Sequence, residues 1–344
     1  MSDETQRLLS NLSGDDPEQQ EQACRRLGEI GDASAVEPLI ALLSRLTTFD
    51  RDDGLRAAAA EALAKIGSPA CVPLLTRMLS AEEAGARRGA VWALGFAQAG
   101  GLVEQARAVE LLTRCLADPN PLVCRDATSA LAGVGGEDVV ESLIGALSHR
   151  HEDVRAQAAK ELGRLRAPLA VPMLAQALAD PSGQVFGEAV VALGAIGGPA
   201  GISALVSALP VHTEMHVRRS RDQYEPLVRA LLRKIGPPAV PALAQAIAET
   251  LEMRVGQQGP WGALSRERRE YGCREAICLL GEIVESVPSL SGEAREESVR
   301  ALREALPTWQ RALRLFSGTP KDTKRELRSL VEITEWVLSK AEGG

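Results

Sequence analysis

Residues 154–178 read VRAQAAKELGRLRAPLAVPMLAQAL, and this stretch decides the fold. Its first half carries apolar residues at the spacing of one helical face: Val154, Ala158, Leu162 and Leu165. After a break at residues 166–168, the second half carries a similar stripe: Val171, Leu174 and Leu178. The pattern predicts two short amphipathic helices joined by a tight turn.

The same plan recurs along the chain, for example in residues 57–79 (AAAAEALAKIGSPACVPLLTRML) and 188–209 (EAVVALGAIGGPAGISALVSAL). Each copy has an Ala-rich segment, a leucine followed by a small residue, a Gly/Pro break and a second apolar segment. The leucine that marks each copy occurs eight times: Leu27, Leu63, Leu94, Leu131, Leu162, Leu193, Leu232 and Leu280. These marker leucines are 36, 31, 37, 31, 31, 39 and 48 residues apart, which indicates a basic length of 31 residues with insertions.

The copies resemble HEAT repeats, and most closely the short bacterial variety also found in phycobilin lyases. Three features carry the resemblance: a (Val/Leu)-Arg step in Leu55-Arg56 and Val154-Arg155, Ala-Leu-Gly-x-Ile-Gly in 192–197, and Val-Pro-x-Leu in 72–75. The resemblance covers roughly residues 15–285. It implies a fold in which the Ala-Leu-Gly helices line a concave surface, and it does not imply one particular function.

We therefore predict an all-α fold, a right-handed α-solenoid of about eight HEAT-like helix pairs followed by a C-terminal helical cap. The solenoid is expected over residues 1–290, beginning with a helix at about 3–12, and the cap over 291–344, continuous with the solenoid. The insertions are expected at about 44–54, 98–107, 210–225 and 251–272.

Composition supports thin helical layers, because 45% of the 344 residues are hydrophobic but only four Trp, four Phe and two Tyr are present. The formal charge of −7 offers no general attraction to nucleic acid or to an anionic membrane. Residues 189–209 carry no charge, but Gly197-Gly198-Pro199 interrupts them, which favours two short helices over one membrane span. The six scattered cysteines contain no CxxC pair and indicate a reducing, cytoplasmic setting.

A pair of aromatics stands out on the face that the repeat predicts to be exposed. Trp92 and Phe96 lie one helical turn apart, and they correspond to Lys160 and Arg164 in the copy with Leu162 and to Ser129 and Gly133 in the copy with Leu131. We expect the aromatic pair to anchor a partner, and we expect Lys160 and Arg164 to contact that partner as well. The alternative is that the insertion after Phe96 folds over both rings and buries them.

The two late insertions are the second candidate binding region. They combine aromatic and arginine side chains, which suits an acidic protein, a phosphate or a nucleic-acid backbone. The contact residues predicted there are Arg219, Trp261, Arg268 and Arg269. A solvated pair of loops is the alternative interpretation.

Sequence motifs for catalysis are sparse. The four histidines include only one His-Glu step, His151-Glu152, whereas HEAT-type deoxyhypusine hydroxylases are expected to repeat that motif. The sequence therefore predicts a non-enzymatic scaffold that binds one or more proteins, with no cofactor, metal or membrane partner and with its oligomeric state open. Two alternatives remain: a phycobilin-lyase-like enzyme or accessory subunit, and a HEAT-like protein that binds nucleic acid, which the net charge disfavours.

Overall fold

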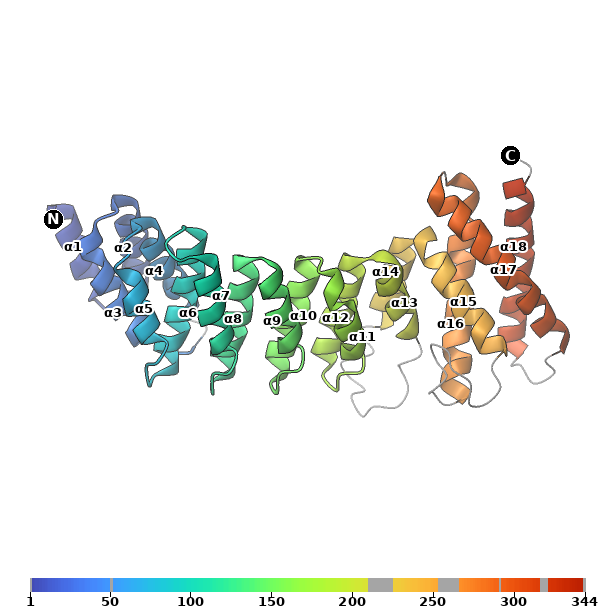
Figure 1. Cartoon of the computed structure of the whole chain (residues 1–344), viewed down its shortest axis with the longest axis horizontal. Helices are drawn as coiled ribbons and strands as arrows, with labels where there is room; N and C mark the ends of the chain where they lie inside the picture. The colour runs from blue at the N-terminus through green and yellow to red at the C-terminus, as the bar shows by residue number, and fades with distance from the viewer. Residues whose placement is uncertain are drawn as a thin grey trace. The chain divides into compact units, whose positions relative to one another are not determined.

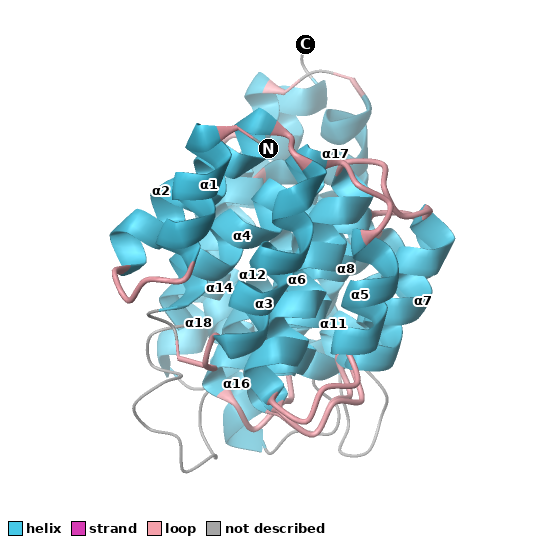
Figure 2. Ribbon diagram, turned by 90° about the vertical axis from the view of Figure 1, so that its left-hand side faces the viewer, coloured by secondary structure: helices cyan, strands magenta, loops and turns pink. Residues whose placement is uncertain are grey.

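The computed structural model describes residues 2–49, 52–209, 225–252, 266–290, 292–315 and 321–342. Over these ranges the chain is helical and contains no strand (Figure 2). The described residues form two compact units, an N-terminal unit (residues 1–165) and a C-terminal unit (residues 166–344). The predicted all-α solenoid is confirmed, whereas its handedness and the boundary between solenoid and cap at residue 290 stay predictions.

In the N-terminal unit the helices form two rows (Figure 1). Helices in the first row contact one another in order: α2 (Pro17–Ile30), α4 (Asp53–Ile66), α6 (Ala84–Ala99), α8 (Pro121–Val134) and α10 (Glu152–Arg164). The second row contains α3 (Val36–Arg45), α5 (Cys71–Met78), α7 (Gln105–Cys115) and α9 (Glu137–Ala146). Helix α1 (Asp3–Leu12) packs on α2 and α3, and η1 spans Ala33–Ala35.

The C-terminal unit repeats this arrangement. One row holds α12 (Gly183–Ile196), α14 (Glu225–Ile235), α16 (Arg266–Val284) and α18 (Lys321–Glu342). The other holds α11 (Val171–Ala177), α13 (Gly198–Ser207), α15 (Val240–Glu252) and α17 (Glu293–Leu315). Short 3₁₀ turns are η3 (Pro168–Ala170), η5 (Pro237–Ala239) and η6 (Val287–Ser289). The uncharged stretch 189–209 forms the end of α12 and α13, as predicted, and no described helix is long and apolar enough to cross a bilayer.

The marker leucines explain why the pairs stack. All eight have no exposed surface, and each lies in the row that begins with α2 in the N-terminal unit or with α12 in the C-terminal unit. A pair of short helices cannot cover its own apolar face, so each pair depends on its neighbours for burial. The core is therefore a series of thin layers of leucine, valine and alanine, as the scarcity of aromatics indicates.

Glycines four residues after the marker leucines end these helices. Gly31 and Gly67 have φ of 72° and 71°, and their N–H groups donate to the carbonyl oxygens of Leu27 and Leu63. Arg166 holds the corresponding position after Leu162 and also has a positive φ, of 49°. A side chain at such a φ is strained, because its Cβ approaches the backbone.

Substitutions at Gly67 and at Arg166 should change the free energy of unfolding in opposite directions. Gly67→Ala is expected to lower the free energy of unfolding by about 1 kcal/mol through backbone strain alone, because a Cβ at Gly67 meets only the Lys65 carbonyl oxygen, at 3.8 Å. Arg166→Gly should raise it by roughly 0.5–1 kcal/mol. Urea denaturation followed by circular dichroism measures both changes, and a stabilising Gly67→Ala would contradict the argument.

Candidate functional site

A groove of about 440 Å³ opens between α6 and α8 in the N-terminal unit. Four residues of α6 and four of α8 line it: Trp92, Gly95, Phe96, Ala99, Asp126, Ser129, Ala130 and Gly133. Seven of these eight are aromatic, small or uncharged, so a ligand would meet a largely apolar surface. The volume falls within the range of about 300–1,000 Å³ that is typical of ligand pockets.

Helical periodicity creates the groove. Arg88, Trp92 and Phe96 are four residues apart, so they follow one face of α6. Gly95, between Trp92 and Phe96 in the sequence, lets α6 and α8 approach closely, since a Cβ on Gly95 would lie 3.2 Å from the Ala130 Cβ. A Cβ on Gly133, by contrast, would meet no atom within 4 Å. The helices thus touch at the floor of the groove and leave it open beside Gly133.

Both predicted anchor residues line this groove, together with Ser129 and Gly133, which the register of the repeat placed beside them. Phe96 is 37% exposed, so the segment after it does not bury that ring. Trp92 is half-buried. Whether the pair contacts a partner stays a prediction.

A buried carboxylate fixes the Trp92 ring. Oδ2 of Asp126 accepts a hydrogen bond from the Trp92 indole Nε1, at 2.8 Å, and one from Nε of Arg88, at 2.7 Å. Asp126 is 7% exposed and Arg88 is fully buried. Nη2 of Arg125 lies 3.5 Å from the other carboxylate oxygen. The groove wall is therefore held by a charge-assisted network, which restricts the ring before any ligand arrives.

The network continues to the loop that follows α3. Nη1 of Arg88 donates to the Thr48 carbonyl oxygen at 2.7 Å, and Nη2 lies 3.3 Å from Asp53. Arg56, also fully buried, pairs with Asp53 and donates to the Thr47 carbonyl oxygen. Burial and the neighbouring Arg88 guanidinium lower the pKa of Arg56, and Asp53 opposes that shift. Two buried guanidinium groups thus hold the insertion after α3 against α4 and α6.

The repeat pattern did not single out Arg88 or Asp126. The signal was present: Arg87-Arg88 precedes the aromatic pair by one turn, and Asp126 lies 38 residues after Arg88, close to one spacing of the marker leucines. Pairing between copies requires side-chain geometry that a single sequence does not give.

Arg87 and Arg155 each lie seven residues before a marker leucine, and both contact a turn. Arg87 forms two bonds with Asp118, Nε to Oδ2 at 2.7 Å and Nη2 to Oδ1 at 2.9 Å, and its Nη1 donates to the Ala81 and Glu82 carbonyl oxygens. Arg155 donates in the same register to the His149 carbonyl oxygen, at 2.9 Å. These arginines bind the turns between helix pairs, and that role is structural.

Lys160 and Arg164 lie on α10, on the face that corresponds to the groove. Lys160 is exposed, and Nη2 of Arg164 donates at 3.0 Å to the carbonyl oxygen of Ala132, which is adjacent to Gly133. Glu161, next to Lys160 on the helix, is only 8% exposed. Its carboxylate is covered because it accepts hydrogen bonds from Gln157 and Arg164.

The remaining predicted contacts are in the late insertions. Arg219 and Trp261 lie outside the described residues. Arg268 and Arg269 fall within α16, but their side chains lie outside the description. The binding role of these four residues stays a prediction.

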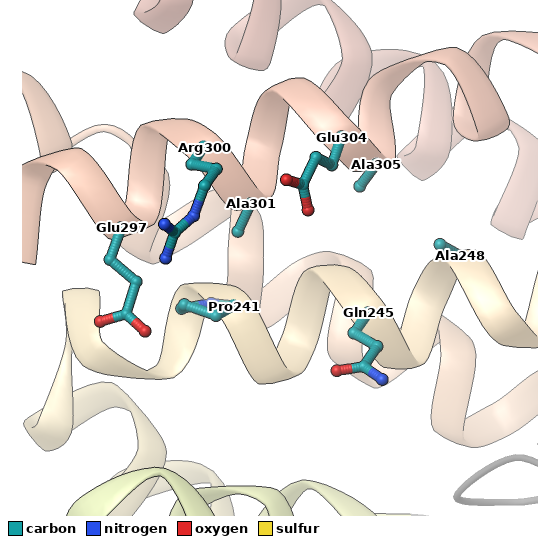
Figure 3. Close-up of a pocket in the computed structure, with 8 residues that line it drawn as sticks. All are labelled: Pro241, Gln245, Ala248, Glu297, Arg300, Ala301, Glu304 and Ala305. Carbon is teal, nitrogen blue, oxygen red and sulfur yellow. The ribbon is translucent and has the colours of Figure 1, made fainter.

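Two further pockets lie within the C-terminal unit. One, of about 310 Å³, separates α15 from α17, and Glu297, Arg300 and Glu304 project into it from α17 (Figure 3). The other, of about 370 Å³, lies between α16 and α18 and includes Cys278 and Glu326. Both have charged walls, unlike the groove between α6 and α8.

Reactive groups are also scarce in the described structure. Burial raises the pKa of Cys24 and of Cys115 to about 12, and that of Cys278 to about 11, which favours the neutral thiol over the nucleophilic thiolate. Within the described ranges, no group of three or more His, Cys, Asp or Glu side chains is placed to hold a metal ion.

A family model for HEAT repeats matches residues 5–95, 41–132, 110–186 and 140–221. Among solved structures, the chain is similar to an engineered protein, with 19% identity over 97% of this chain and 99% of that chain and a TM-score of 0.43. It is also similar to human deoxyhypusine hydroxylase, with 24% identity over 66% of this chain and 83% of that chain and a TM-score of 0.31. No curated protein matches the sequence.

Removing the Arg88 guanidinium should leave the buried Asp126 carboxylate without its ion-pair partner. Arg88→Met is expected to cost about 3–5 kcal/mol, because breaking a buried ion pair leaves an uncompensated charge. The double variant Arg88→Met with Asp126→Leu should lose less than Arg88→Met alone. Urea denaturation of the wild type, Arg88→Met, Asp126→Leu and the double variant gives the coupling energy. If the double variant loses as much stability as Arg88→Met alone, the role assigned to the pair is contradicted.

The thiols should resist modification in the folded protein. At pH 8, we expect Ellman's reagent to react slowly with the native chain and rapidly with all six cysteines in 6 M guanidinium chloride, because five of the six are buried and burial raises the pKa of Cys24, Cys115 and Cys278 in the native chain. Half-buried Cys278 should react first among them. Rapid reaction of several cysteines in the native chain would show that their helices open readily.

Proposed function

Because the chain belongs to the HEAT-repeat family, we propose that it is a non-enzymatic protein-binding scaffold whose α6/α8 groove holds a segment of a partner protein. The observation that carries this proposal is the apolar groove walled by Trp92 and Phe96. Aromatic side chains in a concave, well-packed surface are the residues that contribute most to protein interfaces.

The rigidity of the groove wall supports the same role. The Trp92 ring is tied to Asp126, which is itself held by Arg88, so a partner need not order this side chain on binding. Phe96 supplies accessible apolar area one turn away. The floor at Gly95 and Ala130 has no long side chain that would have to move.

The proposed contacts include residues that do not line the groove. Lys160 and Arg164 would contact the partner at the edge of the groove, and Arg219, Trp261, Arg268 and Arg269 would provide a second contact region. We also propose a cytoplasmic location, which is consistent with six free cysteines. In the described part of the chain, no observation favours the lyase-like or nucleic-acid-binding alternative.

Filling the groove tests the proposal more cleanly than truncating its walls, because Trp92→Ala would also remove a donor to buried Asp126. A Cβ at Gly133 meets no atom within 4 Å, so we expect Gly133→Leu to place its side chain in the groove; because it also replaces a helical glycine, stability should be unchanged or higher by up to about 1 kcal/mol. We expect it to abolish capture of the partner from lysate of the source cells, measured by quantitative mass spectrometry.

Gly145→Leu is the matched control. Like Gly133 in α8, Gly145 is the penultimate residue of its helix, α9, and is exposed. A Cβ added at either glycine would meet no atom within 4 Å. Proteins retained by the wild type and by Gly145→Leu but lost with Gly133→Leu are the expected result. If the same proteins are retained by all three chains, the groove is not the binding site.

A further inference from the structure

The charged residues at the edge of the groove restrict the chemistry of the partner more than the apolar residues of its floor do. We infer that the α6/α8 groove recognises an acidic amphipathic peptide segment, whose apolar residues enter between Trp92 and Phe96 and whose carboxylates face α10. This inference rests on the proposed function and specifies the chemistry of the partner.

The length of the groove suits a short segment. Trp92 and Ala99, the first and last lining residues of α6, are seven residues apart, which corresponds to about 10 Å along a helix. Two turns of a partner helix, or three residues of an extended strand, span that distance. The segment would therefore present two or three large apolar side chains to the floor.

Carboxylates at this edge are already neutralised. Asp126 is paired with Arg88 and bonded by Trp92, and Glu161 is bonded by Arg164 and Gln157. A basic partner would have to compete with these internal partners. It would also have to approach the guanidinium groups that hold the two carboxylates in place.

Cations at the edge are not neutralised to the same extent. Lys160 is exposed and has no ion-pair partner within the described ranges, and Arg125 reaches only Asp126, at 3.5 Å, which Arg88 already neutralises. On the α4 side, Glu61 and Lys65 pair with each other at 2.8 Å and leave no net charge. The groove thus has a cationic edge along α8 and α10.

This edge is a local exception in a chain whose formal net charge is −7. The overall field repels an acidic partner, so an acidic segment is attracted only where cations are in local excess, as they are at this edge. Nucleic acid is a poorer match, because backbone binding depends on a longer track of cations than this edge offers: Arg125 and Lys160, with Arg164 paired to Glu161.

A displayed library of random 12-residue peptides, selected on the full-length chain, tests the inference without assuming a sequence. Selected peptides should carry net negative charge and large apolar residues three or four positions apart. Their affinity should fall about fivefold with Lys160→Glu, should weaken as salt rises, and should fall at least about tenfold with Gly133→Leu. Gly145→Leu should bind as the wild type does.

The outcomes separate the two levels of the argument. Selection of neutral or basic peptides that still require an open groove, or affinities unchanged by Lys160→Glu, would overturn the acidic specificity and leave the scaffold proposal standing. Peptides that bind Gly133→Leu as well as the wild type would overturn the groove itself. No selected peptide, together with tight binding of a fluorescent single-stranded 20-nucleotide DNA or RNA, would overturn both.

Discussion

A pair of short helices cannot bury its own apolar face, and this constraint underlies the whole structure. Each marker leucine, such as Leu94 in α6 or Leu131 in α8, has no exposed surface because helices of adjacent pairs cover it. Burial of one such side chain contributes on the order of 1.5–3 kcal/mol. The layers are thin, so alanine and glycine at the helix contacts are needed as much as leucine, and aromatic rings have few places in the core.

The α6/α8 groove is a consequence of the same close packing. Gly95 brings the two helices together at the floor, and Gly133 leaves the edge open, so a gap forms where a larger side chain would otherwise lie. Trp92 walls the gap because its indole nitrogen reaches Asp126, and Asp126 is buried because Arg88 neutralises it. The candidate site and the core therefore share one hydrogen-bond network. Changes at Arg88 or Asp126 should alter both stability and binding.

Not every unusual aromatic marks a surface. Trp309 and Trp336 both lie beyond residue 285, where the resemblance to the repeats ends. Trp309 has no exposed surface and is part of the core of α17, whereas Trp336 is 50% exposed on α18. The distinction depends on which face of a long helix meets its neighbours. The repeat pattern, which fades after about residue 285, could not supply that information.

The sequence by itself determined the helix pairs, the register of the eight marker leucines and the face on which Trp92 and Phe96 lie, because these follow from local periodicity and from repetition. Only the tertiary structure decided that Arg88 and Asp126 meet across 38 residues, that Glu161 is covered, and that the space beside Gly133 is open. Those features depend on the separation and rotation of neighbouring helices. Side-chain volume and charge pairing across the helix contact set that geometry, and neither is periodic along the chain.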